Sequence, residues 1–250
     1  MRPFLAVLVL IAGAMPADAQ WLDRSWPGIP RTADGKPNLS APAPRGPDGK
    51  PDLTGVWDGE AVVARPDPAD LQSWVSDLAR KYQQEYFKTR PYYQCRPNGP
   101  EAERFGGWKR ILQTPATLAI LNDNLTYRVI HMDGRALEAD PAPSWMGYSV
   151  GRWDGDTLVV DVTNLDEGTW LSDNGLFHSD KTHVVERFRR EGDTLHYDVT
   201  VEDPVVLVEP WKQRSRDLKL MKDYQIEEAP YCSERDKDHL QDLSHHGNLR

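Results

Sequence analysis

A hairpin pattern that occurs twice constrains the fold more than any other feature of the chain. The segments YSVGRWDGDTLVVDVTN (148–164) and VERFRREGDTLHYDVTV (185–201) both contain Gly-Asp-Thr-Leu, followed by Asp-Val-Thr at Asp161 and Asp198, 37 positions apart. The glycines of WDGD and REGD provide the positive φ that a tight hairpin turn requires. Apolar and polar residues alternate after the second turn, as in a strand with one buried face. The pattern therefore predicts two antiparallel hairpins.

Similar runs extend this prediction to most of the chain. The segment TLAILNDNLTYRVIHMDGR (117–135) contains two strand-like runs, separated by a turn at 122–124. With roughly seven to nine candidate strands in series, we predict a mainly β fold. The hairpins favour an antiparallel meander that forms a barrel or a strongly curved sheet, because closure removes exposed strand edges. A barrel of about eight strands can hold one small ligand.

One packed N-terminal helix is expected near residues 68–88. Asp67 is a suitable N-cap, and Pro68 suits the first helical position. Apolar residues then follow the i, i+3, i+4, i+7 spacing of one helix face, at Leu71, Trp74, Val75, Leu78 and Tyr82. We expect this face to pack on the β-rich domain.

The N-terminal segment predicts export to the periplasm or the extracellular space. Residues 1–19 place one arginine ahead of an apolar run and end in small residues, which is the layout of a cleavable signal peptide. The run is shorter than the ~20 residues that span a bilayer, so no transmembrane segment is expected in the mature chain. The remaining sequence predicts a Pro- and Gly-rich extended linker (20–52), a single β-rich domain (53–232) and a polar C-terminal tail (233–250).

Charge and cysteine content limit the classes of partner. The net charge is −9, and removal of residues 1–19 leaves it unchanged because they carry one Arg and one Asp. Nucleic-acid binding requires clustered Lys and Arg, so we expect no nucleic-acid partner. Cys95 and Cys232 are the two cysteines of the chain. In an oxidising compartment they predict a disulfide, with a nucleophilic thiol as the alternative.

Three segments carry a resemblance to known proteins. PDLTGVW (51–57), SWMGYSVGRWDGDTLVVDV (144–162) and HSDKTHVVERFRR (178–190) resemble a family of exported bacterial proteins without an established activity. That resemblance implies export and a β-rich fold, and it brings no catalytic residue with it. The Gly55-Val56-Trp57 sequence also resembles the opening of lipocalin-like barrels, in which the tryptophan closes the bottom of the barrel.

A polar cluster offers the first candidate site. His178, Asp180, His183 and Glu186 lie within nine positions. In one hypothesis they bind zinc or iron, although a continuous strand turns His183 away from the others and no close-spaced metal motif is present. In a second hypothesis, a histidine is a general base that a carboxylate orients, without a metal. In the third, the cluster ends a loop and forms cross-strand charge pairs.

A concave aromatic surface offers the second candidate site. The expected function is binding of a small apolar, aromatic or sugar-like ligand on the concave face of the sheet. The candidate ligand-binding residues are Trp145, Tyr148, Trp170, Tyr197, His131 and Arg187. The alternative is a small-molecule enzyme (a lyase, isomerase, hydratase or hydrolase) that uses the polar cluster. A third hypothesis is an interaction protein of the cell envelope with an exposed tryptophan patch. The sequence identifies no cofactor and leaves the oligomeric state open.

Overall fold

The computed structural model describes residues 31–36, 38, 43–59, 66–91, 96–97, 99, 108–123, 126–138, 142–172 and 175–226. By its internal contacts the chain divides into two units, residues 1–38 and 39–250, and the β-rich domain belongs to the second. The predicted signal peptide, both cysteines and the predicted C-terminal tail lie outside the described residues. The predictions made for them therefore remain predictions.

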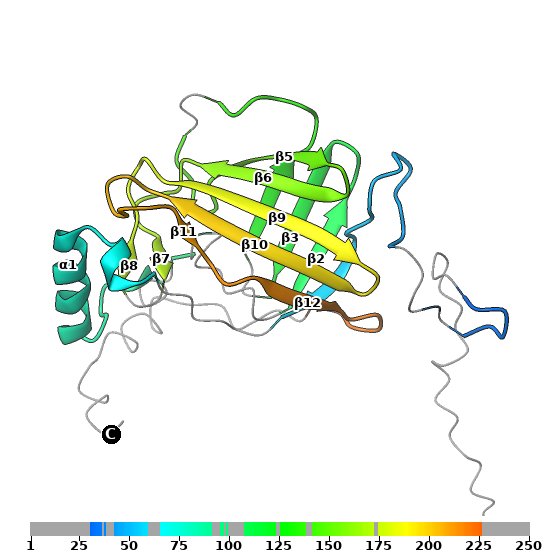
Figure 1. Cartoon of the computed structure of the whole chain (residues 1–250), viewed down its shortest axis with the longest axis horizontal. Helices are drawn as coiled ribbons and strands as arrows, with labels where there is room; N and C mark the ends of the chain where they lie inside the picture. Colours follow the sequence, from blue (N-terminus) through cyan, green and yellow to red (C-terminus); the bar gives the residue numbers. More distant parts are fainter. Residues whose placement is uncertain are drawn as a thin grey trace, which may run out of the picture. The chain divides into compact units, whose positions relative to one another are not determined.

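Nine strands close into a barrel, in the order β10-β12-β1-β2-β3-β4-β5-β6-β9, and β9 pairs back onto β10 (Figure 1). Their bounds are β1 Gly55–Asp58, β2 Lys109–Gln113, β3 Thr117–Asn122, β4 Tyr127–His131, β5 Tyr148–Asp154, β6 Thr157–Thr163, β9 His183–Glu191, β10 Thr194–Glu202 and β12 Arg216–Leu220. The short β11 (Trp211–Lys212) pairs with the end of β10, after the part of β10 that pairs with β12. Strand β7 (Trp170–Ser172) pairs with β8 (Leu176–Phe177) in a separate sheet. The predicted mainly β barrel is confirmed.

The two hairpins that share a sequence pattern form two adjacent ribbons of the barrel wall. The first is β5–β6 and the second is β9–β10, and β6 pairs with β9 so that Asp161 lies opposite Val185. Gly155 and Gly192 occupy equivalent turn positions, and both have a φ of 58°. The hairpin prediction holds at both places because the glycine, the turn length and the alternation all agree.

One junction of the barrel departs from the antiparallel meander. Strands β4 and β5 run parallel and pair at only two positions, Ile130 with Ser149 and His131 with Val150. Antiparallel neighbours need only a tight turn, whereas a parallel pair needs a long crossover. Residues 132–147 provide that crossover, and their sequence, MDGRALEADPAPSWMG, is too rich in Pro, Gly and Asp for another strand of the wall. We call this junction the seam.

The helical segment divides into two parts. Asp67 caps the 3₁₀ turn η1 (Pro68–Asp70), and its carboxylate accepts a hydrogen bond of 2.9 Å from the amide of Ala69. The chain becomes extended at Leu71 and then forms the α-helix α1 (Ser73–Gln84), which is shorter than the expected 68–88. Val75 is fully buried, while Trp74 on the predicted apolar face remains 46% exposed.

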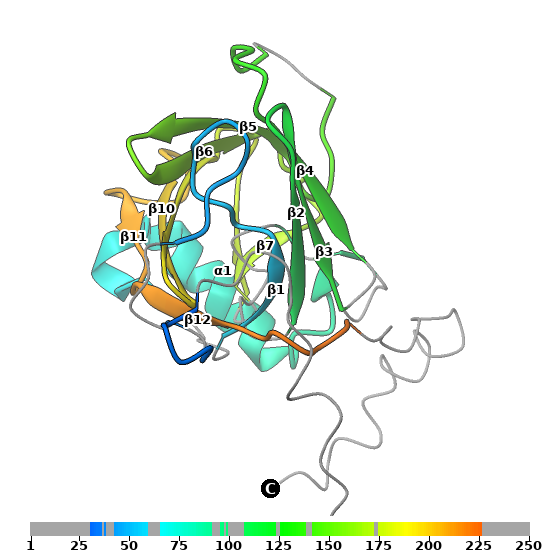
Figure 2. The ribbon, with the colours of Figure 1, turned by 90° about the vertical axis from the view of Figure 1, so that its right-hand side faces the viewer.

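One end of the barrel is closed by the segment that precedes β1 (Figure 2). Trp57 lies inside the barrel with no exposed surface, and its ring nitrogen donates a 2.9 Å hydrogen bond to the carbonyl oxygen of Leu53. The guanidinium of Arg190 lies 5.2 Å from the Trp57 ring centre and donates to the carbonyl oxygen of Asp52. The later part of the predicted linker, residues 43–52, therefore contacts the barrel through these and further bonds described below.

Candidate functional site

A cavity lies at the seam between β4 and β5. Its volume is about 410 Å³. It is lined by Pro97, Thr126, Tyr127, Arg128, Val129, His131, Ser144, Trp145, Met146, Gly147, Tyr148 and Ser149. Because the last two residues of β4 pair with Ser149 and Val150 of β5 and the rest of β4 does not pair with β5, the earlier part of β4 faces the turn that leads into β5 rather than a strand. The seam pocket occupies this place, and its volume lies in the range typical of small-molecule sites.

The outer wall of the seam pocket is aromatic and apolar. The rings of His131 and Tyr148 lie 5.4 Å apart and are tilted by 38°. Tyr127 and Val129 alternate outward on β4 and are 66% and 38% exposed, while Met146 is buried. Such side chains offer flat surfaces for a ring and little competition from bound water.

The inner wall is polar and buried. Arg128 and Ser149 point into the barrel and are only 2% and 1% exposed. Arg128 forms a bidentate ion pair with Glu186, in which Nη1 lies 2.6 Å from Oε2 and Nη2 lies 3.2 Å from Oε1. The hydroxyl of Tyr197 donates a 2.6 Å hydrogen bond to the same carboxylate. The hydroxyl of Ser149 has no hydrogen-bond partner in the described part of the chain.

The protonation of Tyr197 is fixed by its surroundings. Complete burial, and in second place the negative charge of Glu186, raise the pKa of Tyr197 well above its ordinary value. Tyr197 therefore remains a neutral phenol that donates to Glu186. Together with the paired guanidinium of Arg128, this arrangement cancels the charges behind the pocket.

A tight turn places the aromatic side chains at the mouth of the pocket. In the segment 144–147, the amide of Gly147 donates a 3.1 Å hydrogen bond to the carbonyl oxygen of Ser144. Gly147 has a φ of 68°, and a Cβ at this position would lie 2.7 Å from a methyl group of Val162 and 2.8 Å from the carbonyl oxygen of Thr163. Only glycine suits this position, and the turn that it permits sets Trp145 and Met146 against the cavity.

Three of the six predicted ligand-binding residues line the seam pocket: His131, Trp145 and Tyr148. Tyr197 lies directly behind it, bonded to the Glu186 carboxylate that also holds Arg128. Trp170 is buried elsewhere and stacks on Tyr82, with 5.1 Å between ring centres. Arg187 is exposed on the outer face of β9.

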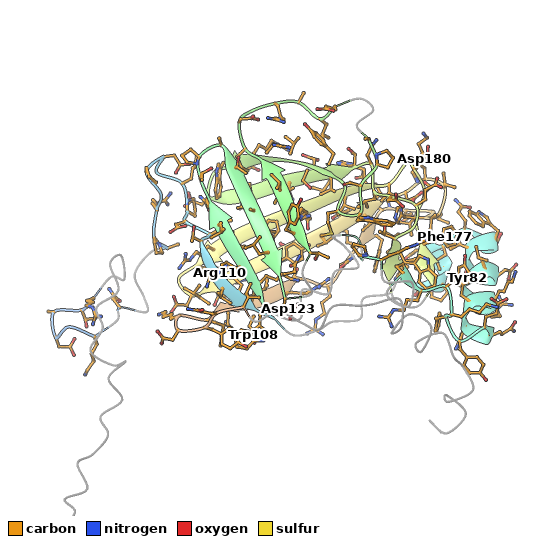
Figure 3. The ribbon with its side chains drawn as sticks, turned by 180° about the vertical axis from the view of Figure 1, so that it is seen from behind. Tyr82, Trp108, Arg110, Asp123, Phe177 and Asp180 are labelled. Atoms are coloured by element: carbon orange, nitrogen blue, oxygen red, sulfur yellow. The ribbon has the colours of Figure 1, made fainter. Side chains whose placement is uncertain are left out.

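The four residues of the polar cluster have four different environments. Glu186 is inside the barrel, whereas His183 lies on the outer face between Asp161 (3.0 Å) and Glu202 (3.2 Å). Asp180 is exposed at the surface, where it forms an ion pair with Lys181 (Figure 3). Strand alternation separates His183 from Glu186 as the period of two requires. The structure does not bring the four side chains together.

His178 and its neighbours organise a loop. The ring of His178 is buried, with Nε2 2.6 Å from the hydroxyl of Thr169 and Nδ1 3.1 Å from the carbonyl oxygen of Ser179. Burial lowers the pKa of His178, against weaker opposing effects from nearby acceptors and acids. The buried carboxylate of Asp203 accepts hydrogen bonds from Ser179, Thr182 and the amides of Val205 and Val206. In the segment 178–190, Ser179 and Thr182 therefore hold the loop in place through their hydrogen bonds to Asp203.

Sequence reasoning overlooked Arg128, although a signal for it was present. In TYRVIH (126–131), alternation places Arg128 on the same face as Ile130, which is the buried face of β4. A buried guanidinium needs a carboxylate partner, and Glu186 occupies the buried face of β9. Within the described residues, no group of three or more His, Cys, Asp and Glu side chains is arranged to hold a metal ion.

Comparisons of the chain with protein families, with curated proteins and with solved structures found no match. Among the described residues, no helix is both long and apolar enough to cross a bilayer.

Proposed function

We propose that this protein binds a small, uncharged ring compound that carries a hydroxyl or carbonyl group. The observation that carries the proposal is the seam pocket, an aromatic-walled cavity of about 410 Å³ with two buried polar side chains on its inner wall. Binding sites for small molecules combine a mainly apolar lining with a few placed polar groups in this way.

The charges around the pocket argue for an uncharged ligand. Of the described lining residues, Arg128 alone carries a permanent charge, and both of its terminal nitrogens bond to Glu186. An anion would have to compete with Glu186 for the guanidinium, and none of the described lining residues offers a carboxylate to a cation. Either charge would lose its hydration without compensation.

Ser149 provides the polar contact. Its hydroxyl is buried and has no partner in the described part of the chain, which costs roughly 1–3 kcal/mol until a bonding group arrives. A ligand can form a hydrogen bond to Ser149 through a hydroxyl or carbonyl group while the ring of the ligand packs against Tyr148 or Trp145. It would then make a polar contact with the inner wall and an apolar contact with the outer wall. Aromatic and sugar-like rings both meet this requirement.

The proposal also places the mature chain outside the cytoplasm, in keeping with the signal-peptide pattern of residues 1–19 and the resemblance to exported proteins. N-terminal sequencing of the protein recovered from the cell envelope or medium tests this part. A chain that begins at Gln20 supports it, and an intact Met1 on the recovered protein contradicts it.

A thermal-shift comparison of matched compounds tests ligand binding. Benzyl alcohol and a methyl pyranoside represent the uncharged class, and benzoate and benzylamine present the same aromatic ring with a charge. A ligand that binds only the folded state raises the melting temperature in proportion to RT ln(1 + [L]/Kd). We expect the uncharged compounds alone to raise it.

Two substitutions locate the site. Trp145→Ala should abolish the shift, whereas Trp74→Ala, which removes a half-exposed tryptophan from α1, should leave it intact. An equal shift in both variants would place the ligand elsewhere. The absence of a shift with every uncharged compound in the unmodified protein would contradict the proposal.

A further inference from the structure

A ten-residue motif occurs twice ahead of the barrel. RTADGKPNLS (31–40) and RGPDGKPDLT (45–54) are identical at six of ten positions, 14 residues apart. We call the residues 31–38 the first arm and the residues 45–54 the second arm. The first arm belongs to the unit 1–38 and the second to the unit that contains the barrel.

Residues 31–36 of the first arm fold in the same way as residues 45–50 of the second arm. In the first arm, the amide of Thr32 donates to the carbonyl oxygen of Lys36 (2.8 Å), that of Gly35 donates to Thr32 (2.9 Å), and the guanidinium of Arg31 donates to Gly35 (2.6 Å). The second arm repeats these bonds from Gly46 to Lys50 (2.8 Å), from Gly49 to Gly46 (3.0 Å) and from Arg45 to Gly49 (2.8 Å). Gly35 and Gly49 have φ values of 82° and 74°. The repeated sequence therefore encodes a repeated structure.

The second arm docks on the turn of the β5–β6 hairpin. The guanidinium of Arg45 forms a bidentate pair with Asp156, with distances of 2.9 and 2.7 Å. The ammonium group of Lys50 lies 3.4 Å from the carbonyl oxygen of Gly155. The guanidinium lowers the pKa of Asp156, as a direct ion pair requires. A Gly-Asp turn is thus the surface that this arm recognises.

Further contacts seat the end of the second arm in the barrel. The amide of Leu53 donates to the side chain of Gln113 (2.8 Å), which in turn donates to the carbonyl oxygen of Pro51 (3.0 Å). The side chain of Leu53 is completely buried. The first arm continues with the same Pro-x-Leu sequence at 37–39.

The first arm carries the same docking groups. Arg31 and Lys36 correspond to Arg45 and Lys50, and both are exposed. Among the described residues, the bond of Arg31 to Gly35 uses one terminal nitrogen, and no carboxylate pairs with the other as Asp156 does with Arg45. One chain therefore has two arms of one kind for one β5–β6 turn.

The other Gly-Asp turn, between β9 and β10, is a poorer target. Asp193 already pairs with Lys222 at 2.6 Å, and the carbonyl oxygen of Gly192 accepts a 2.8 Å hydrogen bond from Arg190. The groups that correspond to Asp156 and Gly155 are therefore in use. The β5–β6 turn is the better match for the first arm.

We propose that the first arm binds the β5–β6 turn of a second copy of this chain, where it takes the place of that copy's own second arm. Such an exchange replaces the contacts of one arm with the same kinds of contact from the other arm. Its cost in free energy is therefore small, and it can link copies of one protein. The inference is independent of any ligand in the seam pocket. It identifies the partner as a second molecule of the same protein.

Sedimentation velocity over a wide range of protein concentrations tests the proposal with three full-length variants. Arg45→Ala weakens the resident arm, so the first arm of another molecule meets less competition. We expect self-association about fivefold tighter than in the unmodified protein, from the ~1 kcal/mol of a well-formed exposed ion pair. The double variant Arg31→Ala/Arg45→Ala should lose this gain, because neither arm then retains its guanidinium.

Asp156→Asn in the Arg45→Ala background provides the matched control, because it removes the target carboxylate and leaves the first arm unchanged. It should also lose the gain. Thermal unfolding of each variant checks that the barrel is folded. If Arg45→Ala is folded and sediments as the double variant does at every concentration, the proposal is overturned. Association that persists in the Asp156→Asn variant would also overturn it.

Discussion

The buried ion pair between Arg128 and Glu186 allows a quantitative test of how dry the barrel interior is. The two side chains are 1% and 0% exposed, and Tyr197 also donates a hydrogen bond to the carboxylate. Arg128→Met keeps most of the side-chain volume and leaves the carboxylate of Glu186 without its cation. Removal of one partner of a buried pair costs about 3–5 kcal/mol, so we expect a loss of that size in the free energy of unfolding.

Equilibrium urea unfolding at neutral pH measures this loss, and two further variants make it specific. Arg152→Met breaks an ion pair with Asp161 in which the arginine side chain is 63% exposed, and it should cost less than about 1 kcal/mol. The triple variant Arg128→Met/Glu186→Leu/Tyr197→Phe removes all three polar groups together. It should lie within about 1 kcal/mol of the unmodified protein or above it, because an apolar replacement of a buried pair is neutral or stabilising.

The reasoning would be refuted by equal losses in Arg128→Met and Arg152→Met, since a small cost at Arg128 requires water around Glu186. A triple variant that unfolds more easily than Arg128→Met alone would also refute it. The cluster would then contribute net stability through its hydrogen bonds rather than neutralise charges that burial imposes.

Three further results are expected from other parts of the structure. Gly147→Ala should destabilise the fold by several kcal/mol, because its Cβ would lie 2.7 Å from Val162 at a φ of 68°. Gly134→Ala has a φ of 79° but open space around it, so it should cost only about 1 kcal/mol. Thermal unfolding compares the two variants, and equal losses of stability would contradict the close approach at Gly147. Asp203→Ala should cost about 2–4 kcal/mol in urea unfolding, since several donors lose a buried acceptor, and a loss below 1 kcal/mol would contradict the anchoring role. His178 titrates in the unfolded chain near its ordinary pKa of 6.5 but resists protonation when buried, so stability should be unaffected above that pH and should fall as the pH drops below it towards the lower folded pKa. Between neutral pH and about pH 5, the melting temperature of His178→Gln should therefore fall by less than that of the unmodified protein. Equal decreases in the two proteins would argue against this titration.

The hairpins could be predicted from the sequence because their signals are local. Turn glycines at 155 and 192 and a period of two on either side determine each ribbon without reference to the rest of the chain. The helix was predicted less well, because the Asp67 cap holds only a single turn before Leu71 becomes extended and pairs with Leu207. A tertiary contact overrode the helical pattern there.

The parallel seam could not be predicted in the same way. The sequences of β4 and β5 do not indicate which strand each will pair with, and the sequence of residues 132–147 is typical of an ordinary loop. The seam pocket depends on this junction. Individual members such as Tyr148 and Trp145 could be suggested by their type, whereas the contribution of Arg128 required knowledge that β4 and β9 face each other across the interior.

The pairing of β1 with β12 has a consequence for the order in which the barrel assembles. Trp57 lies opposite Leu220, so the wall is completed by two segments that stand more than 160 residues apart in the chain. The loop entropy of that last contact must be overcome before its hydrogen bonds form, whereas the β5–β6 and β9–β10 ribbons can form early from neighbouring residues. We therefore expect a slow final folding step in which the ring of strands closes. An emerging or partly translocated chain would expose an open sheet edge until Leu220 has arrived.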